Sequence, residues 1–184
     1  MKRTLTQAGI WFALLCCVGV VGCGLVSYTY KISYLPNSTP PQQPIWNVEY
    51  NVAFSPGGIG VYIKNNGTEP VNIYWDECAY IDPNSVSHRV LTGQSRLITS
   101  SLAQPPTPIA PGSSIQEGLI PADYISGSIV RPLFPANPGG EWWSGYKSSA
   151  KTLINKEIGL LIVAERNGEK RKWTYRARID DVTP

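Results

Sequence analysis

Charged residues and histidine are scarce in this sequence of 184 residues, and their scarcity narrows the functions that it can perform. Asp, Glu, Lys and Arg make up 16% of the chain, against about 25% in an average globular protein. The net charge is only +3, which excludes binding to nucleic acid through bulk positive charge as the main function. His88 is the single histidine, so the chain has no pair of histidines to bind zinc.

The low charge does not indicate a disordered chain, because disorder requires few aromatic residues and these reach 10% here. The 16 prolines and 17 glycines interrupt the chain too often for a helical bundle. The length fits one folded domain, since domains commonly have about 100–200 residues.

The N-terminus contains the strongest motif of the sequence. A basic pair precedes an apolar run over residues 8–21, and the sequence Val-Val-Gly-Cys stands at residues 20–23. This pattern resembles the signal peptide of bacterial lipoproteins, whose lipobox has a small residue just before a cysteine. The resemblance implies that residues 1–22 are removed by cleavage between Gly22 and Cys23. It also implies that Cys23 takes a diacylglycerol. We expect no cofactor besides this covalent lipid.

Two other interpretations of this segment stay open, namely an ordinary secretory signal and an uncleaved anchor helix. All three interpretations export the domain, and the lipoprotein interpretation attaches it to the cell envelope. Gly24 follows the cysteine, at the position where inner-membrane lipoproteins of Gram-negative bacteria have aspartate. By this resemblance we expect the outer membrane as the destination if the source is Gram-negative.

Cleavage would leave 184 − 22 = 162 residues with Cys78 as the remaining cysteine besides the lipidated one. No intramolecular disulfide is then possible, and Cys78 is either buried or paired with another chain. Residues 23–45 contain a polar, proline-rich stretch and are predicted to be a flexible tether with a reach of roughly 25–40 Å. Tyr28, Tyr30 and Tyr34 alternate within it, and they fit either the lipid headgroup region or a short strand of the domain.

From Trp46 onward, alternating apolar residues predict antiparallel strands. The clearest hairpin covers residues 158–179 and turns at Asn167-Gly168, a pair suited to a type I′ turn. Further strands are expected over residues 46–54, 59–63, 71–75, 87–91, 95–102, 113–120 and 124–131, and one short helix over residues 148–156. The prediction for residues 46–184 is an all-β, immunoglobulin-like antiparallel β-sandwich of about seven to nine strands.

The middle of the chain carries a second resemblance. Residues 75–82, 87–90 and 105–114 are similar to a pattern in uncharacterised, exported β-sandwich lipoproteins of bacteria. The resemblance covers about 40 mature residues and implies a small exported domain without a known activity.

No set of residues in the sequence forms a credible catalytic or metal site. His88 would be the base of any triad, but the Gly-x-Ser-x-Gly elbow that presents a nucleophile is absent. We expect His88 to be a hydrogen-bonded surface residue. Asp76, Glu77 and Asp82 are close enough in sequence to suggest calcium, yet their spacing matches no calcium loop, so we predict solvated carboxylates.

Two segments are candidates for recognition. The first is a loop with three large rings, Trp142, Trp143 and Tyr146, which either stack on a ligand or fold over the end of the sandwich. The second is a basic surface on the last hairpin, where charged residues alternate with Trp173, Tyr175, Ala177 and Ile179. Its members are Lys170, Arg171, Lys172, Arg176 and Arg178. They suit an anionic partner such as lipid headgroups, or they protect a sheet edge from aggregation.

The sequence therefore predicts a non-catalytic, lipid-anchored protein of the cell envelope that binds the membrane through its lipid and an envelope protein through its domain. One alternative is a module or hydrolase that acts on cell-wall glycan through the Trp142–Tyr146 loop. Another is a phage or mobile-element lipoprotein that blocks an envelope receptor.

Overall fold

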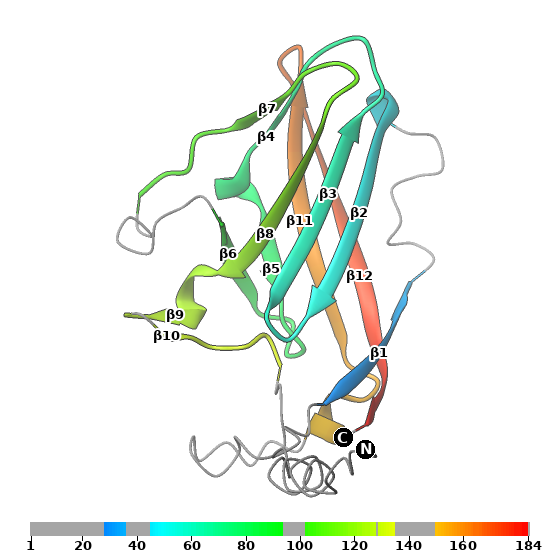
Figure 1. Cartoon of the computed structure of the whole chain (residues 1–184), viewed down its shortest axis with the longest axis vertical. Coiled ribbons are helices and arrows are strands. Elements are labelled where there is room, and N and C mark those ends of the chain that lie inside the picture. The colour runs from blue at the N-terminus through cyan, green and yellow to red at the C-terminus, as the bar shows by residue number, and fades with distance from the viewer. Residues whose placement is uncertain (1–27, 36–44, 94–101, 128, 135–149, 184) are drawn as a thin grey trace, which may run out of the picture.

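The structure is a computed structural model that describes residues 28–35, 45–93, 102–127, 129–134 and 150–183. These residues form an all-β domain whose sheets are antiparallel throughout, with short 3-10 turns between strands (Figure 1). The strands are β1 (Thr29–Tyr34), β2 (Val48–Ser55), β3 (Gly58–Asn65), β4 (Val71–Ile73), β5 (Ala79–Ile81), β6 (Ser87–Thr92), β7 (Thr107–Ile109), β8 (Ser114–Pro121), β9 (Ile125–Ser126), β10 (Ile129–Val130), β11 (Glu157–Arg166) and β12 (Glu169–Thr183). The turns are η2 (Ile45–Asn47), η3 (Trp75–Glu77), η5 (Ala122–Tyr124) and η7 (Ala150–Leu153).

Ten of these strands belong to one curled sheet in the order β1-β12-β11-β5-β6-β8-β3-β2, with β4 and β7 beside this path. The strand β6 joins the two halves of the sheet. Its first residues pair with β5, and Val90 to Thr92 pair with β8 on the other side. The result is a sandwich-like sheet that nearly closes into a barrel (Figure 1).

The gap in the barrel lies between β2 and the β1–β12 edge, and side chains cross it. The Tyr34 hydroxyl donates a hydrogen bond of 2.5 Å to the Val52 carbonyl. At a second point of this gap, the rings of Tyr50 and Trp173 lie edge to face with centroids 4.4 Å apart. Aromatic side chains therefore hold the two ends of the sheet together where no backbone ladder joins them.

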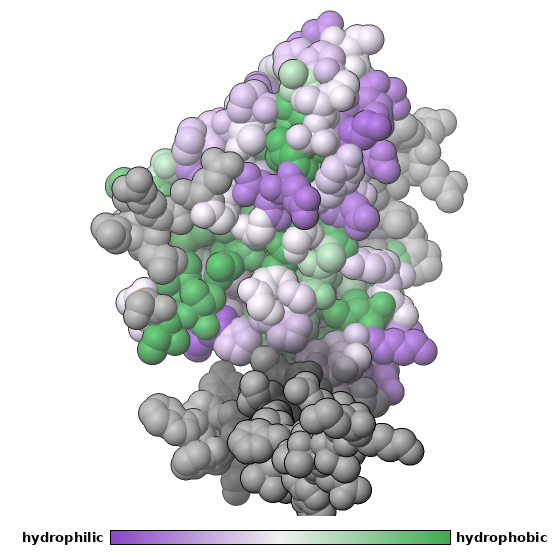
Figure 2. All heavy atoms as spheres, viewed as in Figure 1, coloured by the Kyte–Doolittle hydropathy of each residue, from purple (hydrophilic) through white to green (hydrophobic). Residues whose placement is uncertain are grey.

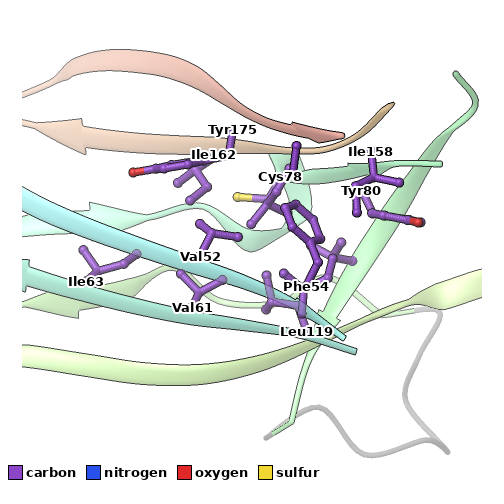
Figure 3. Packing of buried hydrophobic residues seen from close by; sticks show 14 of the residues in the cluster. Val52, Phe54, Val61, Ile63, Cys78, Tyr80, Leu119, Ile158, Ile162 and Tyr175 are labelled. Atoms are coloured by element: carbon purple, nitrogen blue, oxygen red, sulfur yellow. The ribbon is translucent and has the colours of Figure 1, made fainter. Parts of the chain in front are cut away.

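The inner face of the sheet is a single apolar core. Alternate residues of β2, β3 and β12 point into it, as the period of two predicts. Figure 3 shows Val52, Val61 and Ile63 facing Ile162 and Tyr175 across the interior. Tyr175 is part of this core, and the partly buried Tyr50 packs against it.

Several sequence predictions are confirmed. The last hairpin turns at Asn167 and Gly168, which both have the positive φ of a type I′ turn, at 52° and 81°. The strands expected over residues 59–63, 87–91 and 113–120 are β3, β6 and β8. The strand expected over 95–102 lies almost entirely outside the described residues.

Three local predictions are wrong. Trp46 does not begin a strand, because it lies in η2 with a φ of 62° and the strand starts at Val48. Trp75 belongs to η3 rather than to the strand before it, and its indole nitrogen donates to the Thr107 hydroxyl at 2.8 Å. Residues 124–131 form the two short strands β9 and β10 instead of one, since the chain turns at Gly127 with a φ of 60°.

The short helix predicted over residues 148–156 appears within the described residues as the 3-10 turn η7. None of the helical segments in the described ranges is long and apolar enough to cross a membrane.

The fold leads to a first prediction, at Gly159 near the start of β11. A Cβ atom there would lie 2.9 Å from the Tyr175 carbonyl oxygen and 3.4 Å from a methyl group of Ile81. Because both neighbours belong to paired strands that cannot withdraw, we expect Gly159→Ala to lower the free energy of unfolding by about 1–3 kcal/mol. Urea denaturation of the mature protein, followed by tryptophan fluorescence, measures this change.

Gly57 provides the matched control, since a Cβ atom there meets nothing within 4 Å. We expect Gly57→Ala to change the free energy of unfolding by less than about 0.5 kcal/mol. Equal unfolding midpoints for the two variants would contradict the close packing of β11 against β12 and β5.

Candidate functional site

The N-terminal strand β1 determines where the segment that follows Cys23 joins the domain. It pairs antiparallel with the end of β12, from Thr29 opposite Thr183 to Tyr34 opposite Ala177. One further backbone hydrogen bond runs from the Leu35 amide to the Arg176 carbonyl at 3.0 Å. Thr29–Tyr34 therefore belong to the sheet, and the flexible tether predicted over residues 23–45 is wrong for these residues.

The tyrosines of this segment belong to the domain, which settles the alternative that the sequence left open. Tyr28 and Tyr30 are half-buried and lie edge to face, with ring centroids 6.4 Å apart. Tyr30 also packs on the buried Phe134 at 4.6 Å. The amide of the preceding Leu133 donates to the Pro56 carbonyl in the β2–β3 turn at 2.9 Å.

These contacts define one end of the domain, which we call the N-terminal end. It consists of the start of β1 with Tyr28 and Tyr30, the β2–β3 turn at Pro56, and the segment Leu133-Phe134. In Figure 1 it is the lower end of the molecule, and the turn between β11 and β12 is at the opposite end.

Several residues singled out from the sequence lie outside the described ranges. These are Gly22 and Cys23 of the lipobox and Trp142, Trp143 and Tyr146 of the aromatic loop.

The basic surface on β12 is described, and most of its charge is paired. Four of its five cations face a carboxylate: Lys170 with Glu77, Arg171 with Glu169, Arg176 with Glu157, and Arg178 with Asp180. The Glu77 carboxylate raises the pKa of Lys170, chiefly through their hydrogen bond.

Two of these cations also lie over aromatic rings. The Lys170 ammonium is 4.0 Å from the centre of the Tyr74 ring, and the Arg171 guanidinium is 5.4 Å from that of Trp46. Lys172 is exposed and has no ion pair within the described part of the chain. This arrangement favours a charged, solvated surface over a site that collects anions. The β12 edge beside these residues is open only before Ala177, because β1 pairs with β12 from there on.

The three carboxylates considered for calcium point to different partners. Asp76 accepts hydrogen bonds from Arg89 at 2.6 Å and from the Gln104 amide at 2.8 Å. Burial by itself would raise the pKa of Asp76, but the hydrogen bonds from Arg89 and Gln104 together outweigh burial and lower this pKa. Glu77 pairs with Lys170, and one oxygen of Asp82 accepts the amides of Asn84 and Val86. The expectation of solvated carboxylates is wrong for Asp82, whose side chain is buried.

His88 is hydrogen-bonded as the sequence predicted, but it is not a surface residue, because its side chain is only 10% exposed. Its Nδ1 atom is 2.7 Å from the Asp123 carboxylate, and its Nε2 atom is 3.5 Å from that of Asp82. The ring stacks on Tyr80 and meets the edge of Tyr124. His88 thus links η5 to the β5–β6 turn, and its neighbours in the described residues are acids and rings rather than a nucleophile.

Cys78 is buried, and its sulfur accepts a hydrogen bond from the backbone of the sheet (Figure 3). The segments β4 and β5 both pair with β11, and η3 interrupts them. At this interruption the Val163 amide has the Cys78 sulfur as its acceptor at 3.4 Å, and the thiol in turn faces the Tyr74 carbonyl at 3.2 Å. The sulfur therefore replaces a backbone carbonyl that the ladder lacks there.

Sequence reasoning missed the corner formed by η5, β9 and β10. The only local signal was Gly127 with its serine neighbours, which is typical of a turn. The pairing of His88 with Asp123 has no such signal, because 35 residues separate them.

In comparisons with known proteins, no family model, no curated protein and no solved structure matches this chain.

The environment of Cys78 leads to a second prediction. Burial raises the pKa of its thiol to about 12, so the reactive thiolate is scarce up to at least pH 9. We expect maleimide to label Cys78 at least about tenfold more slowly in the folded protein than in guanidinium chloride. Mass spectrometry of the peptide that contains Cys78 measures the labelling.

A Lys172→Cys variant is the control for reagent activity, because this position is exposed and should react at similar rates in both states. Rapid native labelling of Cys78, at the rate found for the Lys172→Cys position, would show that the thiol is accessible.

Proposed function

We propose that the protein is a lipid-anchored, non-catalytic module of the cell envelope, attached through Cys23 and presenting its β domain to an envelope protein. The observation that carries the proposal is the position of β1. The strand begins at Thr29, six residues after the cysteine of the lipobox, and pairs with β12 over its whole length. A lipid on Cys23 would therefore be joined almost directly to a fixed point of the sheet.

The short connection limits how far the domain can lie from the bilayer. Six residues span at most about 20 Å when fully extended. The domain would stay against the bilayer with its N-terminal end facing the lipid, and the opposite end, with the β11–β12 turn, would face away. This arrangement replaces the long tether that the sequence suggested.

The non-catalytic role is supported by the partners that bind the ionisable side chains. Asp76 is bound by Arg89 and Gln104, Glu77 by Lys170, and His88 lies between two carboxylates. Groups that are held in this way stabilise the domain. An extended, rigid β domain with such internal pairs suits a role in assembly or presentation.

The finer description of the fold is part of the same proposal. We propose that the domain is an immunoglobulin-like β-sandwich, as the spacing of its strands indicated. It is supported by the packing of β2 and β3 against β11 and β12 across the interior, where Val52 and Val61 face Ile162 and Tyr175.

The third prediction tests the anchor. We expect Cys23→Ser to prevent lipidation and to move the protein from the membrane to the soluble envelope fraction. Separate Cys16→Ser and Cys17→Ser variants are matched controls, since both residues precede the cleavage site and should leave the fractionation unchanged. Immunoblots of the fractions and the mass of the mature N-terminal peptide provide the two measurements.

Retention of the Cys23→Ser protein in the membrane, with residues 1–22 still attached, would favour the uncleaved anchor helix instead. In-cell crosslinking of the lipidated form, followed by mass spectrometry, tests the second half of the proposal. A protein partner that is enriched at near-equal amount supports it, and enrichment of glycan without a protein contradicts it.

A further inference from the structure

The two-stranded ribbon of β9 and β10 carries the most exposed apolar side chain among the described residues. Ile129 is 68% exposed and the adjacent Val130 is 38% exposed. The two strands pair only with each other, through Ile129 with Ser126 and Val130 with Ile125. Figure 2 shows apolar surface gathered on this part of the molecule, at the lower left. Apolar side chains in such a position commonly mark a contact with a protein or a membrane.

The ribbon is held in a fixed place, so the exposure of Ile129 is not the result of a loose chain end. The Arg131 amide donates to the Tyr124 carbonyl at 2.8 Å, and its guanidinium donates to the Asp123 carbonyl at 3.0 Å. The same guanidinium lies 5.1 Å from the centre of the Tyr124 ring. Asp123 is itself bound to His88, and through it the corner is joined to β6.

The chain after the ribbon leads directly to the N-terminal end. Leu133 is bonded to Pro56 in the β2–β3 turn, and Phe134 packs on Tyr30 of β1. In Figure 1 the ribbon accordingly lies in the lower half of the molecule, as does the start of β1. A lipid on Cys23 would hold this same end at the bilayer.

We propose that the β9–β10 ribbon is a second membrane contact, in which Ile129 and Val130 enter the interface of the bilayer and Arg131 faces lipid phosphate. This inference rests on the lipid anchor proposed above. The exposed Arg131 has no carboxylate partner in the described ranges, and its positive charge complements anionic headgroups. The anchor keeps the ribbon close to the membrane, so even a small apolar contact is populated.

A second copy of the chain fits this surface less well than a bilayer. A stable protein interface buries about 800 Å² on each partner, which is far more than two aliphatic side chains on a four-residue ribbon provide. A bilayer has no such minimum, because each buried apolar group adds to a contact that the lipid already maintains.

The fourth prediction uses the full lipidated protein in nanodiscs of phosphatidylethanolamine and phosphatidylglycerol. A nitroxide is attached at Ile129→Cys, at Val130→Cys and, as the matched control, at Thr68→Cys, which is exposed near the opposite end. We expect the label at residue 129 to collide often with oxygen and rarely with a water-soluble nickel chelate. The label at residue 68 should show the reverse. Circular dichroism verifies that each variant is folded, and Val130→Cys serves if Ile129→Cys is not.

The outcomes separate this inference from the proposed function. If the protein stays on the nanodiscs while labels at 129 and 130 are as accessible to nickel as the label at 68, the ribbon contact is overturned and the lipid anchor stands. If the protein does not associate with nanodiscs at all, both are overturned. Low nickel accessibility at 129 that persists in the unlipidated Cys23→Ser protein, without lipid or detergent, would indicate a protein contact, which also overturns the proposal.

Discussion

The ladder between β11 and β12 is the interaction on which the rest of the domain depends. Its ten residue pairs, from Glu157 with Arg178 to Arg166 with Glu169, form the longest pairing of the sheet. Both outer edges of this hairpin carry further strands, β4 and β5 on β11 and β1 on β12. The hairpin can form early because its turn is local and its strands are adjacent in sequence, whereas every strand added to it must close a much longer loop.

On one side of β11 the pairing is divided between β4 and β5, and the turn η3 lies between these two strands. This interruption determines the partners of several polar residues. The turn η3 leaves the Val163 amide without a carbonyl, and the Cys78 sulfur takes its place. The same turn brings Asp76 to Arg89 and Glu77 to Lys170. In the sequence these carboxylates look like a free cluster. In the structure Asp76 and Glu77 connect η3 to β6, to β12 and to the segment at Gln104.

The position of β1 connects the fold to the proposed function. Because β1 is a strand and not part of a tether, a lipid six residues before it would keep this end of the domain close to the membrane. The ribbon with Ile129 would then meet the bilayer from the same end. A domain held in this way offers its far end, with the β11–β12 turn, to partners in the envelope.

The sequence by itself determined the features that depend on neighbouring residues. The period of two identified β2, β3 and β12 and their buried faces, and Asn167-Gly168 specified a type I′ turn between β11 and β12, because pleating and turn stereochemistry act over a few residues. Only the tertiary structure decided that Thr29–Tyr34 pair with β12, that His88 lies between Asp82 and Asp123, and that the basic residues of β12 face carboxylates. Those contacts join segments far apart in the chain, such as Ser33 and Asp180, and they depend on which sheet edges remain free once the long hairpin has formed.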